Sequence, residues 1–178
     1  MNLVKLKEFS VDFDCNGMTP FFQVHQDNRV RFDIDALNMA NLKLIINDIF
    51  NKDKQINAIV VSEYIVNNKR KSAKTRIGQV IHLKSWKEHV VLEEGTRDGI
   101  VYSTIGSLNP TDVYNYCLSV KKGLTRAYIA FHSNEYLLYV SSDVIDIISS
   151  NATNISKLKD RYNDFYDRYY EGNAHIYG

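Results

Sequence analysis

The chain has 178 residues, a hydrophobic content of 44% and a formal net charge of +1. This length suits one domain with a substantial core, and the near-zero charge gives no overall field that would favour nucleic acid or an anionic membrane. No apolar run is long enough for a signal peptide or a membrane-spanning helix, so we expect a single cytoplasmic domain over 1–178 without membrane association. Cys15 and Cys117 fit no metal-binding spacing, and a reduced pair is a simpler interpretation than a disulfide.

In the first half of the chain, the apolar pattern changes from strand to helix and back to strand. Alternating apolar residues over 6–13 predict a half-buried strand, and shorter strands are expected at 21–25 and 29–32. Apolar residues then recur at helical spacing and predict a helix over 35–51, capped by Asp33 or Asp35. The β-branched run 57–66 predicts a central strand, followed by a basic loop over 67–76.

The second half of the chain predicts more strands and further helices. Strands are expected near 78–84, 88–93 and 99–105, and Asn109-Pro110 begins a helix that Gly123 ends. Segments 124–132 and 136–140 predict a hairpin, 144–149 a short helix, and the chain after a polar break at 150–154 a helix to about Glu171. The pattern indicates an α+β fold: a largely antiparallel sheet with about four helices packed against one face.

Residues 12–17, DFDCNG, match the first half of a calcium-binding EF-hand loop. Asp12, Asp14 and Asn16 would supply oxygen ligands, but the last ligand position is Gln23, and no helix follows. The same letters favour a tight turn between the first two strands, because Asn16 and Gly17 both tolerate positive φ. We therefore expect a turn and no metal or other cofactor, with a calcium site as the alternative.

Basic residues gather in the predicted loop 67–76, around Lys69, Arg70 and Lys71. Such a run can bind phosphates or an acidic partner surface, and it can also be a solvated loop. The lack of net basic charge favours the solvated loop and disfavours nucleic acid as a partner. His82 and His89 fall on neighbouring predicted strands, where a two-histidine nuclease site is possible and ordinary cross-strand polar residues are the simpler interpretation.

Acidic residues gather in a later predicted turn: Glu93, Glu94 and Asp98. Paired carboxylates can bind magnesium or perform acid–base chemistry, and they can equally serve as turn and cap residues, which we favour here. A negative patch that meets a basic ligand is a further interpretation. The chain also contains no P-loop, GxGxxG or GxSxG motif, so no reaction is indicated.

The C-terminal segment is rich in tyrosine. Four of its residues share one stripe of the predicted helix and are expected to dock on the sheet: Leu158, Tyr162, Phe165 and Tyr169. Tyr166, Tyr170 and Tyr177 are then left for contact with a partner, because tyrosine buries area while its hydroxyl stays at a wet rim.

The opening stretch NLVKLKEFSVDFDCNGMTPFF, with the chain length and the sheet-and-helix pattern, resembles immunity proteins of bacterial contact-dependent growth inhibition systems. The resemblance implies a small cytosolic protein that binds one cognate toxin domain, often a nuclease, one-to-one and blocks it without catalysis. It carries over no functional residues, because no family motif is matched. An inhibitor of this kind needs a specific surface, and a free sheet edge could accept a partner's hairpin.

The sequence thus supports a toxin-binding immunity protein as the first hypothesis. The alternatives are a nucleic-acid-binding protein or nuclease that uses the basic loop, and a calcium-dependent protein. The candidate partner-binding residues are Lys69, Arg70, Lys71, Glu93, Glu94, Asp98, Tyr166 and Tyr170.

Overall fold

The computed structural model describes residues 2–51, 55–125 and 128–172 and confirms the α+β class. Its elements are β1 (Leu3–Lys5), β2 (Ser10–Asp12), η1 (Pro20–Gln23), η2 (Gln26–Asn28), β3 (Arg29–Asp33), α1 (Met39–Phe50), β4 (Ile56–Val66), β5 (Lys69–Ser72), α2 (Ile77–Val80), β6 (Ser85–Leu92), β7 (Gly99–Leu108), α3 (Pro110–Lys121), β8 (Ile129–His132), β9 (Tyr136–Val140), β10 (Val144–Ser149) and α4 (Ala152–Arg161). The elements η1 and η2 are short 3-10 helices.

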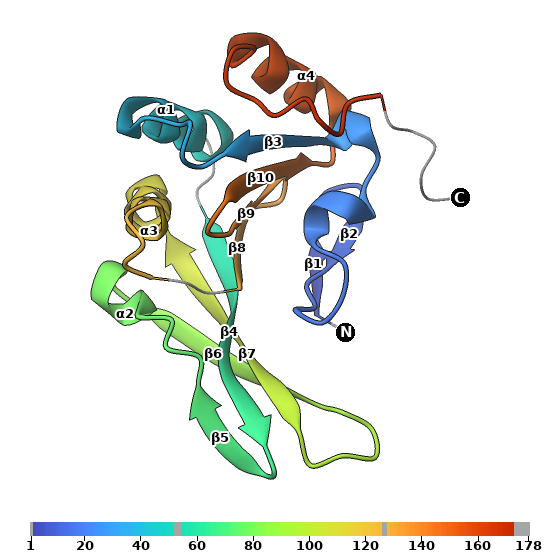
Figure 1. The fold of residues 1–178 in the computed structure, drawn as a ribbon, viewed down its shortest axis with the longest axis vertical. Helices are drawn as coiled ribbons and strands as arrows, with labels where there is room; N and C mark the ends of the chain where they lie inside the picture. Colours follow the sequence, from blue (N-terminus) through green and yellow to red (C-terminus); the bar gives the residue numbers. More distant parts are fainter. Residues whose placement is uncertain (1, 52–54, 126–127, 173–178) are drawn as a thin grey trace.

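An eight-stranded sheet forms the centre of the fold, and all its strand pairs are antiparallel. The strand order is β3-β10-β9-β8-β4-β7-β6, and β5 pairs with β4 beside this path. A separate two-stranded sheet joins β1 to β2. In Figure 1, β5, β6 and the far ends of β4 and β7 project away from the body that the helices cover.

Two buried clusters lie on opposite faces of the sheet. On one side, which we call the helix face, residues of α1, α2, α3 and α4 pack against the strands. On the other, which we call the hairpin face, the β1–β2 hairpin covers Ile59, Val61, Ile100 and Tyr102. Figure 1 shows α1 and α3 on one side of the strands and the β1–β2 hairpin on the other. The helices therefore share one face, as the sequence predicted.

Local signals account for the helix starts. The side chain of Asn109 accepts from the backbone of Asp112, whose carboxylate accepts in return from the backbone of Asn109, so α3 begins with a reciprocal capping box. Helix α1 begins later than predicted, because Asn38 rather than Asp33 or Asp35 caps it. Asp33 instead accepts from the backbone of Asp35 in a turn before the helix.

Residues 144–149 are strand β10, and the prediction of a short helix was wrong. Ile145 and Ile147 are buried in the helix-face cluster, while Ile148 is buried on the hairpin face. A strand buried on both faces reads as a continuous apolar run, which periodicity alone does not distinguish from a short helix. Pairing with both β3 and β9 makes this segment a strand.

Other boundaries also differ from the sequence prediction. The chain turns between Leu6 and Phe9, so only β2 lies within the strand expected over 6–13, and β1 precedes that range. The strand expected at 21–25 is η1, with Pro20 at its first position. The strand expected at 78–84 is α2, which places Ile77 and Ile81 in the helix-face cluster. The predicted basic loop 67–76 contains strand β5, and α4 ends at Arg161, short of Glu171.

His132 lies in β8, and its burial gives the fold a defined pH dependence. Burial lowers the pKa of His132 to about 4, from an ordinary value of 6.5. Between these two values the unfolded chain binds a proton that the folded chain excludes, so stability is lost as the pH falls through this window.

We expect the free energy of unfolding to decrease by up to about 3 kcal/mol between pH 6.5 and pH 4 through this residue. Urea unfolding across that range measures it, and His132→Gln should remove this part of the slope. His82→Gln, at an exposed position, serves as the control and should leave the slope in place. Equal slopes in wild type and His132→Gln would contradict the assignment.

Candidate partner-binding surface

Strands β4 and β7 extend beyond the body and form the base of a distal arm, defined here as residues 62–72 and 85–103. The pairing of β4 with β7 shifts by one residue between Val61 and Glu63, so Ser62 is an extra residue in β4. The hydroxyl of Ser62 donates to the carbonyl of Val101 at 3.1 Å and accepts from Ser103 at 2.7 Å. Because a bulge bends its strand, Ser62 marks the point where the arm leaves the body.

The two turns at the end of the arm are bonded to each other. Asn67 and Asn68 both have positive φ, at 51° and 61°, as a tight hairpin between β4 and β5 requires. The backbone N–H of Asn67 donates to a carboxylate oxygen of Asp98 at 2.7 Å, and the N–H of Asn68 donates to the carbonyl of Arg97 at 2.9 Å. The β4–β5 and β6–β7 turns therefore form one tip (Figure 1).

Arg70 joins three strands of the arm on the helix face. Its guanidinium lies 3.2 Å from a carboxylate oxygen of Glu63 on β4 and 2.9 Å from one of Glu88 on β6. The hydrogen bond from Arg70, with a second from the indole of Trp86, lowers the pKa of Glu88. Arg70 is thus occupied by two carboxylates, which reduces the basic character of the Lys69–Lys71 run.

Lys69 and Lys71 point to the hairpin face, because successive side chains of a strand alternate between faces. Lys71 is paired across the ladder with Tyr64, whose side chain is exposed. Glu93, Glu94 and Asp98 occupy the β6–β7 turn at the tip. The structure thus brings all the charged candidate residues into the arm: Lys69, Arg70, Lys71, Glu93, Glu94 and Asp98.

The two histidines considered for a nuclease site do not lie on neighbouring strands. His89 is on β6, whereas His82 lies in the irregular segment before that strand. Among the described residues, no group of three or more His, Cys, Asp or Glu side chains is placed to hold a metal ion.

A pocket of about 200 Å³ lies between the N-terminal hairpin and the arm. Asp14 and Asn16 of the DFDCNG stretch line it together with Glu93 and Tyr102. Asp14 accepts from the backbone of Asn16 at 3.0 Å and from the hydroxyl of Tyr102 at 3.3 Å, so its carboxylate already serves the local turn. The pocket brings together the two acidic stretches noted in the sequence, although they lie far apart along the chain.

The DFDCNG stretch forms a turn, closed by a hydrogen bond from the Gly17 N–H to the Asp14 carbonyl at 3.1 Å. Neither Asn16 nor Gly17 has positive φ, so the conformational reason for the prediction was wrong, and the turn leads to η1 rather than to a second strand. Asp12 accepts from the backbone of Asn2, and Gln23 bonds the backbone of Asp12 in both directions. Gln23, at the last position of the calcium motif, thus closes the loop.

A pocket of about 280 Å³ lies at the base of the arm. Its lining contains no carboxylate, amine, imidazole or thiol among the described residues, so it offers no acid–base or metal chemistry there. The lining residues are Val61, Tyr64, Ala73, Val120, Tyr128, Ser141 and Ser142.

Tyr166 and Tyr170 lie at the opposite end of the sheet from the arm. Tyr166 forms an isolated antiparallel bridge with Phe32 of β3 and packs beside the helix-face cluster. The ring of Tyr170 packs edge-on against Phe21 and Phe22, with centroids 5.6 and 5.3 Å away. These tyrosines hold the C-terminal segment to the body. Leu158 and Tyr162 pack in the helix-face cluster as predicted, but α4 ends at Arg161, and Phe165 and Tyr169 are exposed. Tyr177 lies outside the described residues.

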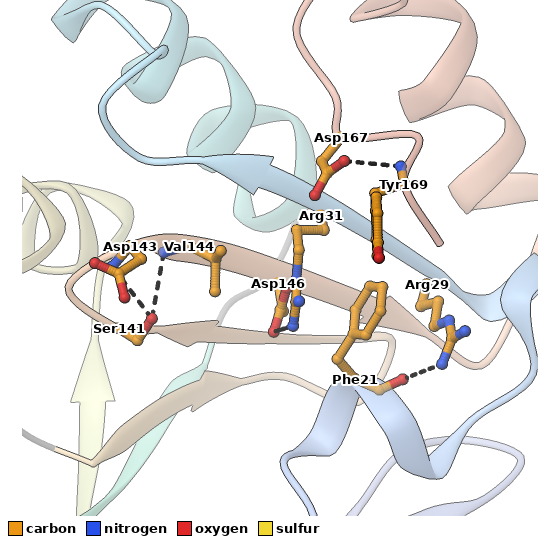
Figure 2. A network of polar contacts seen from close by, with 9 residues as sticks. All are labelled: Phe21, Arg29, Arg31, Ser141, Asp143, Val144, Asp146, Asp167 and Tyr169. Carbon is orange, nitrogen blue, oxygen red and sulfur yellow. Dashed lines mark hydrogen bonds and ion pairs between the residues drawn. The ribbon is translucent and has the colours of Figure 1, made fainter. Parts of the chain in front are cut away.

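Sequence reasoning missed a buried ion pair beside these rings. Two nitrogens of Arg31 donate to the two carboxylate oxygens of Asp146 at 2.6 and 2.8 Å, joining β3 to β10 (Figure 2). The side chain of Asp146 is 0% exposed. Arg31 also lies over the rings of Phe21 and Tyr170, with its guanidinium carbon 4.1 and 5.1 Å from their centroids. The available signal was Asp146, the single charged residue within the mostly apolar run of β10.

Burial and pairing act on this ion pair in opposite directions. Burial raises the pKa of Asp146, and the hydrogen bonds from Arg31 offset only part of that effect. Burial by itself lowers the pKa of Arg31. The hydrogen bond to Asp146 and the negative charge of the Asp146 carboxylate outweigh this effect and raise the pKa of Arg31 above its usual value. The pair is largely closed to solvent, so it offers no open site for a ligand, and removal of either partner would leave the other charge buried without its counter-charge.

We expect Asp146→Asn to destabilise the protein by about 3–5 kcal/mol, because it leaves the Arg31 guanidinium buried without its counter-charge. Denaturant unfolding measures the change. Asp143→Asn makes the same chemical change at an exposed position and should stay within about 0.5 kcal/mol of wild type. The double variant Arg31→Met/Asp146→Leu should be less destabilised than Asp146→Asn alone, and similar losses for Asp146→Asn and Asp143→Asn would refute this role.

Within the described residues, no helix is both long enough and apolar enough to cross a membrane. The chain matches no protein-family model, no curated protein and no solved structure.

Proposed function

We propose that this protein is a cytosolic immunity protein that binds a cognate toxin domain one-to-one and neutralises it by occlusion, without catalysis of its own. The observation that supports the proposal is the joining of two hairpin turns into one charged tip at the end of the arm. The tip residues belong to neither buried cluster, so their side chains do little for the core and remain available to a partner.

The tip offers opposite charges on different sides. Glu93 and Glu94 are exposed in the β6–β7 turn, whereas Lys69 and Lys71 are exposed on β5. Carboxylates of this kind complement the basic surface that a nuclease presents to phosphates, and such complementarity increases association rate and specificity. The bonded turns hold these charges in a fixed arrangement, which lowers the entropy lost when a partner binds.

Apolar contact area lies beside these charges. Trp86 and Leu92 on β6 are exposed on the helix face of the arm, next to the Arg70–Glu88 pair. Partner-binding surfaces commonly combine aromatic and aliphatic contacts with a polar rim, and this part of the arm has that composition.

The test is protection of growth when the protein is co-expressed with the toxin domain encoded beside its gene. We expect Glu93→Lys/Glu94→Lys/Asp98→Asn to weaken toxin binding by about tenfold or more in titration calorimetry and to reduce protection. Asn at position 98 keeps an oxygen acceptor for the N–H of Asn67, so the tip should stay folded.

A control variant changes charge elsewhere on the surface. Glu8→Lys/Asp35→Asn/Asp160→Lys makes the same change in net charge at exposed positions outside the arm and should bind and protect as wild type does. Unchanged affinity in the tip variant would remove the tip from the interface, and failure of wild type to bind or protect would overturn the proposed function.

Nucleic-acid binding through the basic hairpin is the second candidate. Tyr64 lies exposed beside Lys71, and an aromatic ring next to lysine is a known arrangement for stacking a base. The pairing of Arg70 with Glu63 and Glu88 weighs against it, because the guanidinium donors are already used.

We accordingly expect no salt-dependent binding to labelled single-stranded or duplex oligonucleotides in fluorescence anisotropy. Binding that falls steeply with salt, and that Lys69→Ala/Arg70→Ala/Lys71→Ala abolishes, would favour the second candidate instead.

A further inference from the structure

Strand β6 is an edge strand with one unpaired side. Its inner side pairs with β7 along its whole length, and no described residue pairs with its outer side. The opposite edge of the sheet, β3, is different, because the C-terminal segment covers it through the Phe32–Tyr166 bridge and a hydrogen bond from the Asp167 N–H to the Arg31 carbonyl. The outer side of β6, called here the β6 edge, is thus an uncovered template for another strand.

The hydrogen bonds of the β6–β7 hairpin show which residues form this edge. The N–H of Glu93 donates to the carbonyl of Asp98 in the same register as the ladder, so Glu93 and alternate residues before it face β7. The remaining residues direct their N–H and C=O groups outward. These outward residues are Trp86, Glu88, Val90 and Leu92.

The outward residues also share one side-chain face. Trp86 is opposite Ile105 of the helix-face cluster, so the set lies on the helix face of the sheet. The side chains of Trp86, Val90 and Leu92 are 38%, 40% and 65% exposed. The charge of Glu88, which lies among them, is balanced by Arg70. An apolar row therefore runs along the edge of β6, where the outward N–H and C=O groups have no partner strand among the described residues.

We propose that a second copy of this chain covers the β6 edge, with the two β6 strands antiparallel about a two-fold axis at His89. In this register Trp86 of each copy is opposite Leu92 of the other, and Glu88 is opposite Val90. All the outward residues then pair with outward residues. Moving the axis to Glu88 or to Val90 leaves one of them without a partner, and an axis at Glu88 also places two glutamates opposite each other.

Charges at the two ends of β6 support a second copy as the occupant. Continuing the same register, Lys84 of one copy is opposite Glu94 of the other, and both side chains are exposed. On the hairpin face, Lys87 of one copy is diagonal to Glu93 of the other, within reach of a long side chain. The strand is basic near its start and acidic just after its end, so antiparallel pairing brings opposite charges together twice on each side of the axis.

The inference does not rest on the proposed function, although Glu93 and Glu94 belong to both surfaces. Val90 belongs to the β6 edge alone, and its N–H faces away from β7, so proline there should remove an outward donor without breaking the β6–β7 ladder. Val90→Thr keeps the N–H and a β-branched side chain and is the matched control.

Sedimentation equilibrium between about 1 and 100 μM should show a concentration-dependent dimer for wild type and for Val90→Thr. Val90→Pro should raise the dimer dissociation constant by about tenfold or more, because two inter-copy hydrogen bonds, one from the Val90 N–H of each copy, are lost and the strands are held apart. Its far-UV circular dichroism should match that of wild type. If Val90→Pro does not fold, Leu92→Lys, at the most exposed apolar position of the edge, replaces it and should weaken the dimer similarly.

A charge exchange tests the register. Lys84→Glu and Glu94→Lys should each weaken the dimer, and the double variant should restore it, because the new charges again lie opposite across the axis. A double variant no stronger than the single ones would reject this register.

A wild-type protein that stays monomeric at the highest concentration would overturn the proposal. Suppose that this monomer binds the toxin domain and that Val90→Pro abolishes the binding while Val90→Thr does not. The β6 edge then accepts a strand of the toxin, and a second copy is excluded as its occupant. Because toxin protection is measured separately, loss of the dimer inference leaves the proposed function standing, and the reverse also holds.

Discussion

The hydrogen-bond ladder of β4 is the constraint on which both parts of the molecule depend. One side of β4 pairs with β7 throughout, but its other side changes partner, from β8 in the first half of the strand to β5 in the second. The extra residue Ser62 lies where this change occurs. A single strand therefore passes from a region covered on both faces into an arm that is largely open to solvent. Any shift in its register would move Ile59 and Val61 off the hairpin face and Glu63 away from Arg70.

At the other end of the sheet, an ion pair and aromatic rings hold the segments around Phe21 and Tyr170 to β3. Arg31 and Asp146 neutralise each other between β3 and β10, and the flat guanidinium of Arg31 is covered by Phe21 from the N-terminal region and Tyr170 from the C-terminal one. A buried ion pair alone adds little net stability, because desolvation offsets most of its attraction. Here Arg31 also contacts Phe21 and Tyr170, whose segments lie outside the eight-stranded sheet, which gives the pair a specific structural role.

Elements whose local signals agree with their surroundings could be predicted from the sequence. The Asn109-Pro110 helix start and the central strand β4 are examples, since capping chemistry and β-branched residues favour the structures that packing also favours. Strand β10 could not be predicted in this way, because burial on both faces removes the alternation that identifies a strand. Its conformation depends on pairing with β3 and β9, and the residues of β10 alone do not reveal that pairing.

The candidate site shows the same division. The sequence shows that the arm contains basic and acidic stretches, but it does not show that these stretches lie side by side. Their proximity depends on a hydrogen bond from the N–H of Asn67 to the Asp98 carboxylate, and these residues are far apart in the chain. The packing of Tyr170 is equally hidden in the sequence. Its environment is made by Phe21 and Phe22, at the far end of the chain, and no spacing rule connects such residues.

The bulge at Ser62 has an evolutionary consequence. It separates residues that maintain the core from residues at the tip, so substitutions at Glu93 or Glu94 alter the exposed surface while leaving both buried clusters intact. Surface substitutions away from buried features usually change stability by less than about 0.5 kcal/mol. An arm built in this way lets the exposed surface change in sequence, while the body keeps the same fold and tolerates the change.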